Sequence, residues 1–241
     1  MAGALNVASV QPGQIITTGL QLWLEPDLYS SYPGSGTSCY DLSTNHYTAT
    51  LQRSVGFDTG RAPSFTFDGA AGRKYINVGQ YISSNTFTLS SWFKSSSTAT
   101  YQMLFSKEQT GGQPWNYRLW LELTTGKIRG DTANGVSSEN LVTSANYCDG
   151  TWHNAVFVRD VAGGNLYLYA DGAQVATAAV TLGSVTNNQN VWIGLSAYTG
   201  ESAVGSYPMN GNIGQSLIYN VALSATQVKQ NFNAMRGKYG V

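Results

Sequence analysis

The chain has 241 residues, a length that suits one large all-β domain as well as two smaller domains. Only 11% of its residues are charged, and 13 basic and 13 acidic side chains give a formal net charge of zero. Nucleic-acid binders carry a basic patch because phosphate neutralisation supplies much of their affinity. The longest basic run here is Arg73-Lys74, so we set that class aside.

No stretch approaches the ~20 apolar residues of a membrane-spanning helix, so we expect no membrane insertion. The first basic residue is Arg53, and the residues before it lack both regions of a signal peptide. We therefore expect synthesis in a cytoplasm without export by this route. That compartment favours free thiols for Cys39 and Cys148, although the sequence leaves a bridge between them open. Near-zero net charge leaves a homo-oligomer open as well.

Residues 1–18 are small, polar and weakly patterned, which indicates an N-terminal arm or linker that becomes ordered only on a partner. Residues 19–241 carry one strand signal after another without a domain boundary, and we assign them to one β-sandwich domain. Clear alternation of apolar and polar residues predicts strands over 20–25, 63–69, 87–94 and 116–123.

Two of these strands have faces that can be assigned. Within 87–94, Phe87, Leu89, Ser91 and Phe93 share one face and Trp92 lies on the other. Within 116–123, one face carries Tyr117, Leu119, Leu121 and Leu123, and the other carries Arg118, Trp120 and Glu122.

The turns and the single helix have local signals of their own. Residues 124–128 read as a hairpin turn, and Asp171-Gly172 suits a type I′ turn between the strands 165–170 and 173–178. A helix is predicted over 224–240, where Ser224 and Gln227 form a capping box. We expect Gly237 to take the left-handed position that ends this helix.

Five segments, in order along the chain, are "GLQLWLE", "FTFDG", "FTLSSWFK", "DGTWHNAVFVRD" and "NGNIGQSLIYNVALSATQVKQNF". Together they resemble the laminin-G-like branch of the concanavalin A-like lectin/glucanase superfamily, and the last resembles versions in virion structural proteins of tailed phages. The resemblance covers residue 19 to the end. It implies an all-β jelly-roll sandwich of two antiparallel sheets with one short C-terminal helix. It leaves function open, because this fold hosts lectins, enzymes and structural modules.

The segment 146–160 has the composition of an active site, since it brings Cys148, Asp149 and His153 close together in sequence. In the family that it resembles, the DG-x-W-H run opens a core strand. That makes Trp152 a core residue and His153 a hydrogen-bonded histidine near a strand end. On this interpretation Cys148 and Asp149 precede the strand and point elsewhere, so His153 lacks the partner that a catalytic dyad needs within about 3 Å.

Glycanases of this superfamily carry acids at alternate positions of a strand, near the separations that hydrolysis requires. The nearest match here is Glu25-Pro26-Asp27, which lacks a third acid and in which Pro26 interrupts the strand. The G-x-S-x-G motif of serine hydrolases is absent. We therefore expect no catalytic residue and no enzymatic activity.

Two loops offer the aromatic, amide and hydroxyl groups with which such folds hold sugars. The predicted glycan contacts are Trp115, Asn116, Tyr117, Tyr198, Tyr207 and Asn210. The alternative is that Trp115 and Tyr207 cap the ends of the sandwich. Relatives often place two acids after "FDG" for calcium, where this chain keeps Asp68 but has Arg73-Lys74. Asp68 is therefore only a weak metal candidate, and we expect no cofactor, with calcium as the alternative.

Taken together, these patterns predict a non-catalytic surface or structural protein of a phage virion: a head decoration, a knob or a tail-fibre module. It would attach to other virion proteins through the arm 1–18, contact host-cell glycans, and be located in the virion after synthesis in the host cytoplasm. The alternative is a free-standing carbohydrate-binding lectin, and a glycan hydrolase is third. The glycan, the place on the particle and the oligomeric state stay open.

Overall fold

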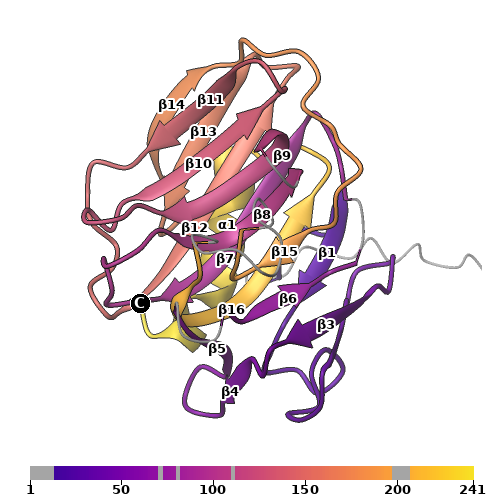
Figure 1. Cartoon of the computed structure of the whole chain (residues 1–241), viewed down its shortest axis with the longest axis vertical. Coiled ribbons are helices and arrows are strands. Elements are labelled where there is room, and N and C mark those ends of the chain that lie inside the picture. Colours follow the sequence, from indigo (N-terminus) through magenta and orange to yellow (C-terminus); the bar gives the residue numbers. More distant parts are fainter. Residues whose placement is uncertain (1–13, 70–72, 80–81, 110–111, 197–206) are drawn as a thin grey trace, which may run out of the picture.

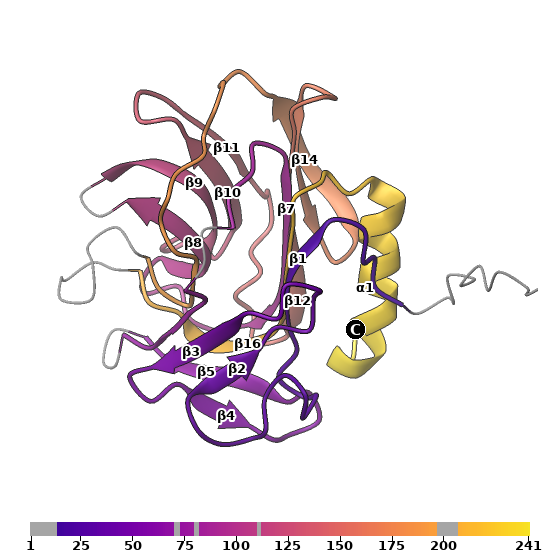
Figure 2. The ribbon, with the colours of Figure 1, turned by 90° about the vertical axis from the view of Figure 1, so that its right-hand side faces the viewer.

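The computed structural model describes residues 14–69, 73–79, 82–109, 112–196 and 207–241. Two antiparallel sheets face each other, and α1 (Ala225–Tyr239) lies on the outer face of one of them, as Figure 2 shows. We call the sheet that carries the helix sheet A and the other sheet B. The prediction of a two-sheet jelly-roll sandwich with one C-terminal helix is confirmed.

Each sheet contains eight strands, labelled in Figure 1 where there is room. Sheet A has the order β14-β13-β12-β7-β16-β5-β4, and β1 also pairs with β16. Its strands are β1 (Leu20–Leu24), β4 (Gly56–Asp58), β5 (Ser64–Asp68), β7 (Phe87–Lys94), β12 (Trp152–Asp160), β13 (Asn165–Ala170), β14 (Ala173–Ala179) and β16 (Asn210–Tyr219).

Sheet B has the order β11-β10-β9-β8-β15-β6-β3-β2. Its strands are β2 (Ser38–Tyr40), β3 (Thr48–Gln52), β6 (Tyr75–Asn77), β8 (Gln102–Gln109), β9 (Gly112–Leu121), β10 (Ile128–Ala133), β11 (Ser138–Val142) and β15 (Trp192–Ile193). Within the described residues, no helix is both long and apolar enough to cross a membrane.

The main core lies between the sheets and follows the predicted alternation. Phe87, Leu89 and Phe93 of β7 meet Leu119 and other inward residues of β9, all at most 1% exposed. Burying each such side chain contributes about 1.5–3 kcal/mol. The predicted strand 116–123 is wrong at its end, because β9 stops at Leu121.

The segment after β9 turns through residues 122–127 into β10, and Leu123 is 37% exposed there. Leu123 therefore does not join the inward face on which the alternation placed it. The hairpin predicted at 124–128 is nevertheless present, since Ile128 of β10 pairs with Leu121 of β9. The second hairpin is also confirmed: Asp171 and Gly172 both have positive φ, and β13 pairs with β14.

A smaller core lies between sheet A and α1. Trp92 stacks on Phe232 and on Tyr239, at ring-centroid distances of 5.5 and 4.2 Å, and Trp152 packs in the same cluster. The capping box of Ser224 is confirmed. The predicted end of the helix is wrong, because Gly240 and not Gly237 takes the left-handed position.

The helix continues to Tyr239 because that ring packs on Trp92 and its hydroxyl accepts a hydrogen bond from the Gln215 N–H at 2.7 Å. These contacts outweigh the weak helix propensity of Gly237.

Residues 14–18 of the predicted arm pack against α1 and β16 of this chain. The Ile16 N–H donates to Asn231 Oδ1 at 2.7 Å, and the Tyr219 hydroxyl donates to the Ile16 carbonyl at 2.9 Å. The Gln230 side chain donates to the Gln14 carbonyl at 2.9 Å. The expectation that the arm orders only on a partner therefore fails for these five residues, and residues 1–13 lie outside the described part of the chain.

Three buried charged side chains hold residues 181–189 across one end of the sandwich. Lys107 Nζ donates to Asn187 Oδ1 at 2.6 Å and to the carbonyls of residues 187 and 189 at 2.7 and 2.8 Å. Arg159 donates to the carbonyls of residues 85, 182 and 183, and Glu139 accepts the backbone N–H groups of residues 181 and 182. Arg159 of the segment 146–160 is thus structural.

The two cysteines, Cys39 and Cys148, are buried and unbridged, so the prediction of free thiols is confirmed.

Candidate ligand-binding site

The outer face of sheet B collects aromatic and arginine side chains. Because Tyr117, Leu119 and Leu121 of β9 point into the core, the alternate residues Arg118 and Trp120 point outward. Strand register extends this face sideways, since Trp120 pairs with Met103 of β8 and Arg129 of β10. In the same way Arg118 pairs with Ser106 and Asp131.

Arg118 is held in place by two buried acids. Its Nε and Nη2 donate to the two carboxylate oxygens of Asp131 at 2.9 and 2.6 Å, a bidentate pair. Its Nη1 lies 3.6 Å from Glu108 Oε2. Both acids are only 1% exposed. The remaining Glu108 oxygen accepts the hydroxyls of Ser106 and Ser196 at 2.6 and 2.9 Å.

Burial raises the pKa of Glu108, and the positive charge of Arg118 opposes that rise. Burial alone would lower the pKa of Arg118, but the charge and hydrogen bonds of Asp131 raise it. The guanidinium therefore stays charged and fixed in direction. The two acids serve to orient Arg118, because their oxygens are already directed at it and at serine hydroxyls.

Two aromatic rings lie against this arginine, and two more pack on one of them. The Arg118 guanidinium lies 3.9 Å from the centroid of Trp115 and 5.5 Å from that of Trp120. Tyr207 stacks parallel to Trp120 at 6.0 Å, and Tyr101 meets both edge-on at 4.9 Å.

The guanidinium of Arg129, on the neighbouring strand β10, lies 5.2 Å from the centroid of the Trp120 ring, and its Nη1 donates to Glu122 Oε1 at 3.3 Å. We call these six side chains the aromatic–arginine layer: Tyr101, Trp115, Arg118, Trp120, Arg129 and Tyr207.

The layer contains polar atoms without partners. The indole Nε1 atoms of Trp115 and Trp120, together with Arg129 Nε, have no hydrogen-bond partner among the described residues. Buried donors of this kind are uncommon, and each costs about 1–3 kcal/mol.

The structure divides the predicted glycan contacts. Trp115 and Tyr207 both belong to the aromatic–arginine layer, Trp115 against Arg118 and Tyr207 against Trp120. The predictions of Asn116 and Tyr117 as glycan contacts are wrong, because both residues are at most 1% exposed. The Asn116 amide donates to the Ser84 carbonyl at 3.1 Å, and the Tyr117 hydroxyl donates to the Ile82 carbonyl at 2.9 Å. Both side chains are held by the segment that precedes β7.

Of the other two predicted contacts, only Asn210 lies in the described part of the chain, and no described interaction brings it into the layer. Tyr198 lies outside the described residues. Asn210 is exposed at the start of β16, where its side chain packs beside Gly69 and its N–H donates to Gln102 Oε1 at 2.9 Å.

Sequence reasoning missed Tyr101, Arg118, Trp120 and Arg129. The alternation of Arg118, Trp120 and Glu122 on one face of a strand was a usable signal for part of the layer. The buried acid Glu108 comes from the neighbouring β8, and only the observed register brings it to Arg118.

Asp68, the weak metal candidate, forms an ion pair with a lysine. Lys74 Nζ lies 3.1 Å from its carboxylate, so one of the two residues that replace the acids of relatives neutralises it. Across the described residues, no group of three or more His, Cys, Asp and Glu side chains could hold a metal ion.

The acid pair Glu25 and Asp27 has a structural partner. Lys238 Nζ of α1 lies 2.6 Å from Glu25 Oε1 and 2.7 Å from Asp27 Oδ1. Gln215 Nε2 donates to the other Glu25 oxygen at 2.6 Å. Burial raises the pKa of Glu25 to about 7, against the opposing charge of Lys238. This pair ties the end of β1 to α1.

His153 has carboxylates on both ring nitrogens. Asp171 Oδ2 lies 2.8 Å from Nδ1 and Asp149 Oδ1 lies 3.2 Å from Nε2. The prediction that Asp149 points elsewhere is wrong, because the turn at Gly150, with φ of 84°, folds the carboxylate back onto Thr151 and the ring. The prediction of a hydrogen-bonded histidine near a strand end is confirmed, and Trp152 is in the core.

The pKa of His153 is raised. Burial alone would lower it, but the hydrogen bonds and negative charges of Asp171 and Asp149 outweigh burial. The other Asp171 oxygen accepts the Asn154 N–H at 2.8 Å, so this cluster fastens the β13–β14 turn to β12.

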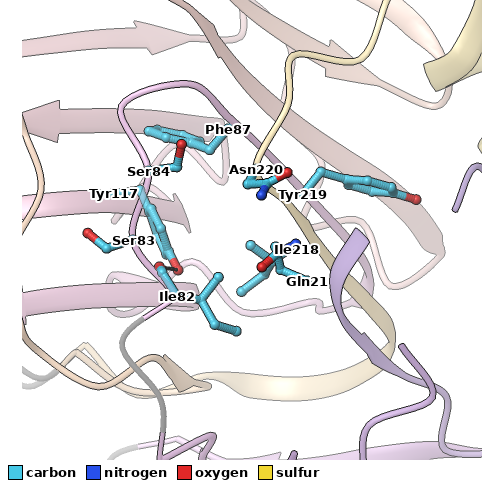
Figure 3. A pocket seen from close by; sticks show the side chains of 9 residues that line it. All are labelled: Gln21, Ile82, Ser83, Ser84, Phe87, Tyr117, Ile218, Tyr219 and Asn220. Atoms are coloured by element: carbon cyan, nitrogen blue, oxygen red, sulfur yellow. Dashed lines mark hydrogen bonds between the residues drawn. The ribbon is translucent and has the colours of Figure 1, made fainter. Parts of the chain in front are cut away.

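A cavity of about 110 Å³ opens between the sheets near the start of β7. In Figure 3, Tyr117 and the Ile82–Ser84 segment lie on one side of it, and Gln21, Ile218 and Asn220 on the other. Ligand sites for drug-sized molecules span about 300–1,000 Å³. This cavity is therefore large enough for a few water molecules and too small for a sugar.

A family model described as Laminin_G_3, concanavalin A-like lectin/glucanases superfamily, matches residues 67–229. No curated protein sequence matches the chain.

Many solved structures share the fold. The botulinum neurotoxin serotype C1 binding domain is similar with a TM-score of 0.68 and 14% identity, over 91% of this chain and 53% of that chain. The binding domain of Paraclostridial Mosquitocidal Protein 1 has a TM-score of 0.66 and 17% identity, over 90% and 52%. The CBM40 of a Ruminococcus gnavus sialidase, bound to α2,3-sialyllactose, has a TM-score of 0.53 and 18% identity, over 61% and 82%. The chain spans about half the length of the toxin domains, and identities this low establish the shared fold alone.

Proposed function

The chain belongs to the concanavalin A-like lectin/glucanases superfamily, and from that premise we propose that it is a non-catalytic carbohydrate-binding domain whose ligand lies on the outer face of sheet B. The observation that carries the proposal is the aromatic–arginine layer. It combines partly exposed rings, those of Tyr101, Trp115 and Tyr207, with a guanidinium that two buried acids hold in one direction.

The chemistry of a sugar matches this surface. A pyranose ring has a face of C–H groups that loses water favourably against an aromatic ring, while its hydroxyls accept from fixed N–H donors. Trp115 and Tyr207 offer the rings, and the guanidinium of Arg118 offers N–H donors. A carbohydrate-binding module bound to sialyllactose is among the solved structures of this fold, which supports such a use of it.

Catalysis is disfavoured by the positions of the acids. Glycoside hydrolysis needs one carboxyl to protonate the leaving oxygen and a second to reach the sugar or a water. Asp131 is engaged bidentately by Arg118, and Glu108 is engaged by two serines and lies beneath the layer. The acid pair that most resembles the catalytic motif, Glu25 and Asp27, binds Lys238 on another part of the fold.

The test is a glycan-array screen of the whole chain, followed by calorimetry on any glycan that binds. Loss of one stacking ring is expected to weaken binding tenfold or more in Trp115→Ala and in Tyr207→Ala. Tyr29→Ala is the matched control, because Tyr29 is 81% exposed. Binding that survives both layer substitutions would refute this site, and silence across the array would refute carbohydrate binding.

We further propose that the domain serves on a phage virion, as a head decoration, knob or tail-fibre module that adheres to host glycans. This rests on the resemblance of the closing segment 210–232 to virion proteins. Because residues 14–18 pack on α1, attachment to a virion partner would use residues 1–13. Deleting residues 1–13 should abolish incorporation into particles and leave glycan binding intact. Incorporation of the deleted chain at the normal level would refute this role for the arm.

A further inference from the structure

A second cavity lies on the opposite side of the molecule from the aromatic–arginine layer. It has a volume of about 330 Å³ and opens on the outer face of sheet A, beside the start of α1. Its floor is formed by outward residues of three adjacent strands, Asp160 of β12, Tyr167 and Tyr169 of β13, and Gln174 of β14. Its wall is formed by residues 222–225, which lead into the helix.

Tyr169 is the clearest sign that this cavity receives a ligand. Only 2% of the residue is exposed. Its hydroxyl makes no hydrogen bond with a described residue and is not sealed from solvent, so it is open to the cavity and available to a ligand.

Two neighbouring side chains, Tyr167 and Gln174, also present polar groups to solvent at this cavity. Tyr167 is half-buried, its ring centroid lies 6.4 Å from that of Tyr169, and its hydroxyl is likewise unpartnered among the described residues. Gln174 pairs with Tyr169 across β13 and β14 and makes no side-chain hydrogen bond within the described chain. The cavity thus has two aromatic rings, an apolar wall at Leu223, and three polar groups without partners.

The charge around the cavity selects a neutral ligand. Asp160 gives the floor a negative charge, which opposes an anion. The first backbone N–H groups of α1 carry a partial positive charge, which opposes a cation. A molecule with an apolar face and several hydroxyls satisfies both conditions.

From these observations we propose that the cavity lined by Tyr167, Tyr169, Gln174 and Leu223 is a second, independent binding site for one neutral hexose unit of a glycan. The Tyr167 and Tyr169 hydroxyls and the Gln174 amide bond the sugar hydroxyls, and the rings and Leu223 cover its C–H face. This site shares no residue with the aromatic–arginine layer, so it stands or falls separately from the function proposed above.

The experiment is a titration of the ¹⁵N-labelled full chain, followed by backbone NMR. The probes are the methyl glycosides of glucose, galactose, mannose and N-acetylglucosamine, with methyl glucuronide as the charged comparison. We expect at least one neutral probe to shift the amide signals around Tyr167, Gln174 and Leu223. Methyl glucuronide should shift them far less.

Two substitutions test the contacts without threatening the fold. Tyr167→Phe removes only an unpartnered hydroxyl, and Gln174→Ala alters an exposed residue. Each should weaken binding about fivefold, the factor that one lost hydrogen bond of ordinary strength produces. Trp115→Ala should leave the shifts at this cavity unchanged, and it separates failure here from failure of the first site.

Three results would overturn the proposal. The first is the absence of shifts at this cavity with every neutral probe. The second is equal or stronger binding of methyl glucuronide. The third is binding that appears only after residues 1–13 are deleted, which would make the chain's own arm the occupant.

Discussion

Replacing Arg118 by methionine should destabilise the protein strongly at neutral pH. Asp131 and Glu108, each 1% exposed, would lose the cation between them, while Arg118 itself is only 13% exposed. Removing one partner of a buried ion pair costs about 3–5 kcal/mol, because the other charge stays buried without compensation. For a domain of this size, that corresponds to a fall in Tm of about 6–20 °C.

The pH dependence of this loss gives a sharper test. Without Arg118, burial is left unopposed by that charge in raising the pKa of Glu108 above its unfolded value. The folded state then binds more protons than the unfolded state in the window between the two pKa values, so stability falls as pH rises through it. The deficit of Arg118→Met should therefore shrink as pH is lowered from 7 toward 5.

The assay is urea unfolding of both proteins at pH 7 and pH 5, with Asp131→Asn added to the Arg118→Met background. Neutralising Asp131 in this way should recover part of the lost free energy of unfolding. A deficit below about 1 kcal/mol at pH 7 is what an exposed ion pair gives. That result, or a deficit that grows toward pH 5, would refute the argument that buried acids fix the arginine.

Two further predictions concern the fold. His153→Gln should be less stable than the native chain below about pH 6.5, by up to about 1 kcal/mol of unfolding free energy. This difference should close as pH rises through the raised pKa of His153, because the native imidazolium then loses its proton. Urea unfolding across pH 5–8 measures it, and a difference that widens with pH would contradict the prediction. Gly211→Ala should cost about 3 kcal/mol or more, because φ is 142° and a Cβ would lie 2.1 Å from the Lys94 carbonyl oxygen. Gly183→Ala is its control, with no atom within 4 Å of the added Cβ, and equal stability of the two variants would contradict the steric argument.

Local sequence patterns predicted the features that depend on a few neighbouring residues, such as turns and the start of the helix. The I′ turn at Asp171-Gly172 follows from two residues that tolerate positive φ, and the capping box of Ser224 lies within one turn of helix. The end of that helix was missed because Tyr239 is kept helical by Trp92, a residue far away in sequence. No propensity of the last residues reports such a contact.

The part of the candidate site that lies in the β9–β10 hairpin was predictable from the sequence. Since the turn after β9 was predicted, pairing Arg118 with Asp131 could have been derived by counting back along both strands. Tyr117 was assigned both to an apolar face and to a sugar site, and the strand alternation was the better guide. The contribution of Glu108 depends on bulges in β8–β9 pairing, which break the register and which no local pattern revealed.

The place of β16 in sheet A determines when this protein can fold. β16 comes from residues 210–219, yet it pairs with β1, β5 and β7, and so joins the early strands of the sheet to those in the middle of the chain. A nascent chain that ends before residue 210 has three separate parts of this sheet, namely β14-β13-β12-β7, β5-β4 and β1 alone, each with open edges, and such edges favour aggregation. The sheet is therefore united only after residue 219 has been synthesised. A premature stop before residue 210 would remove the strand that joins these parts.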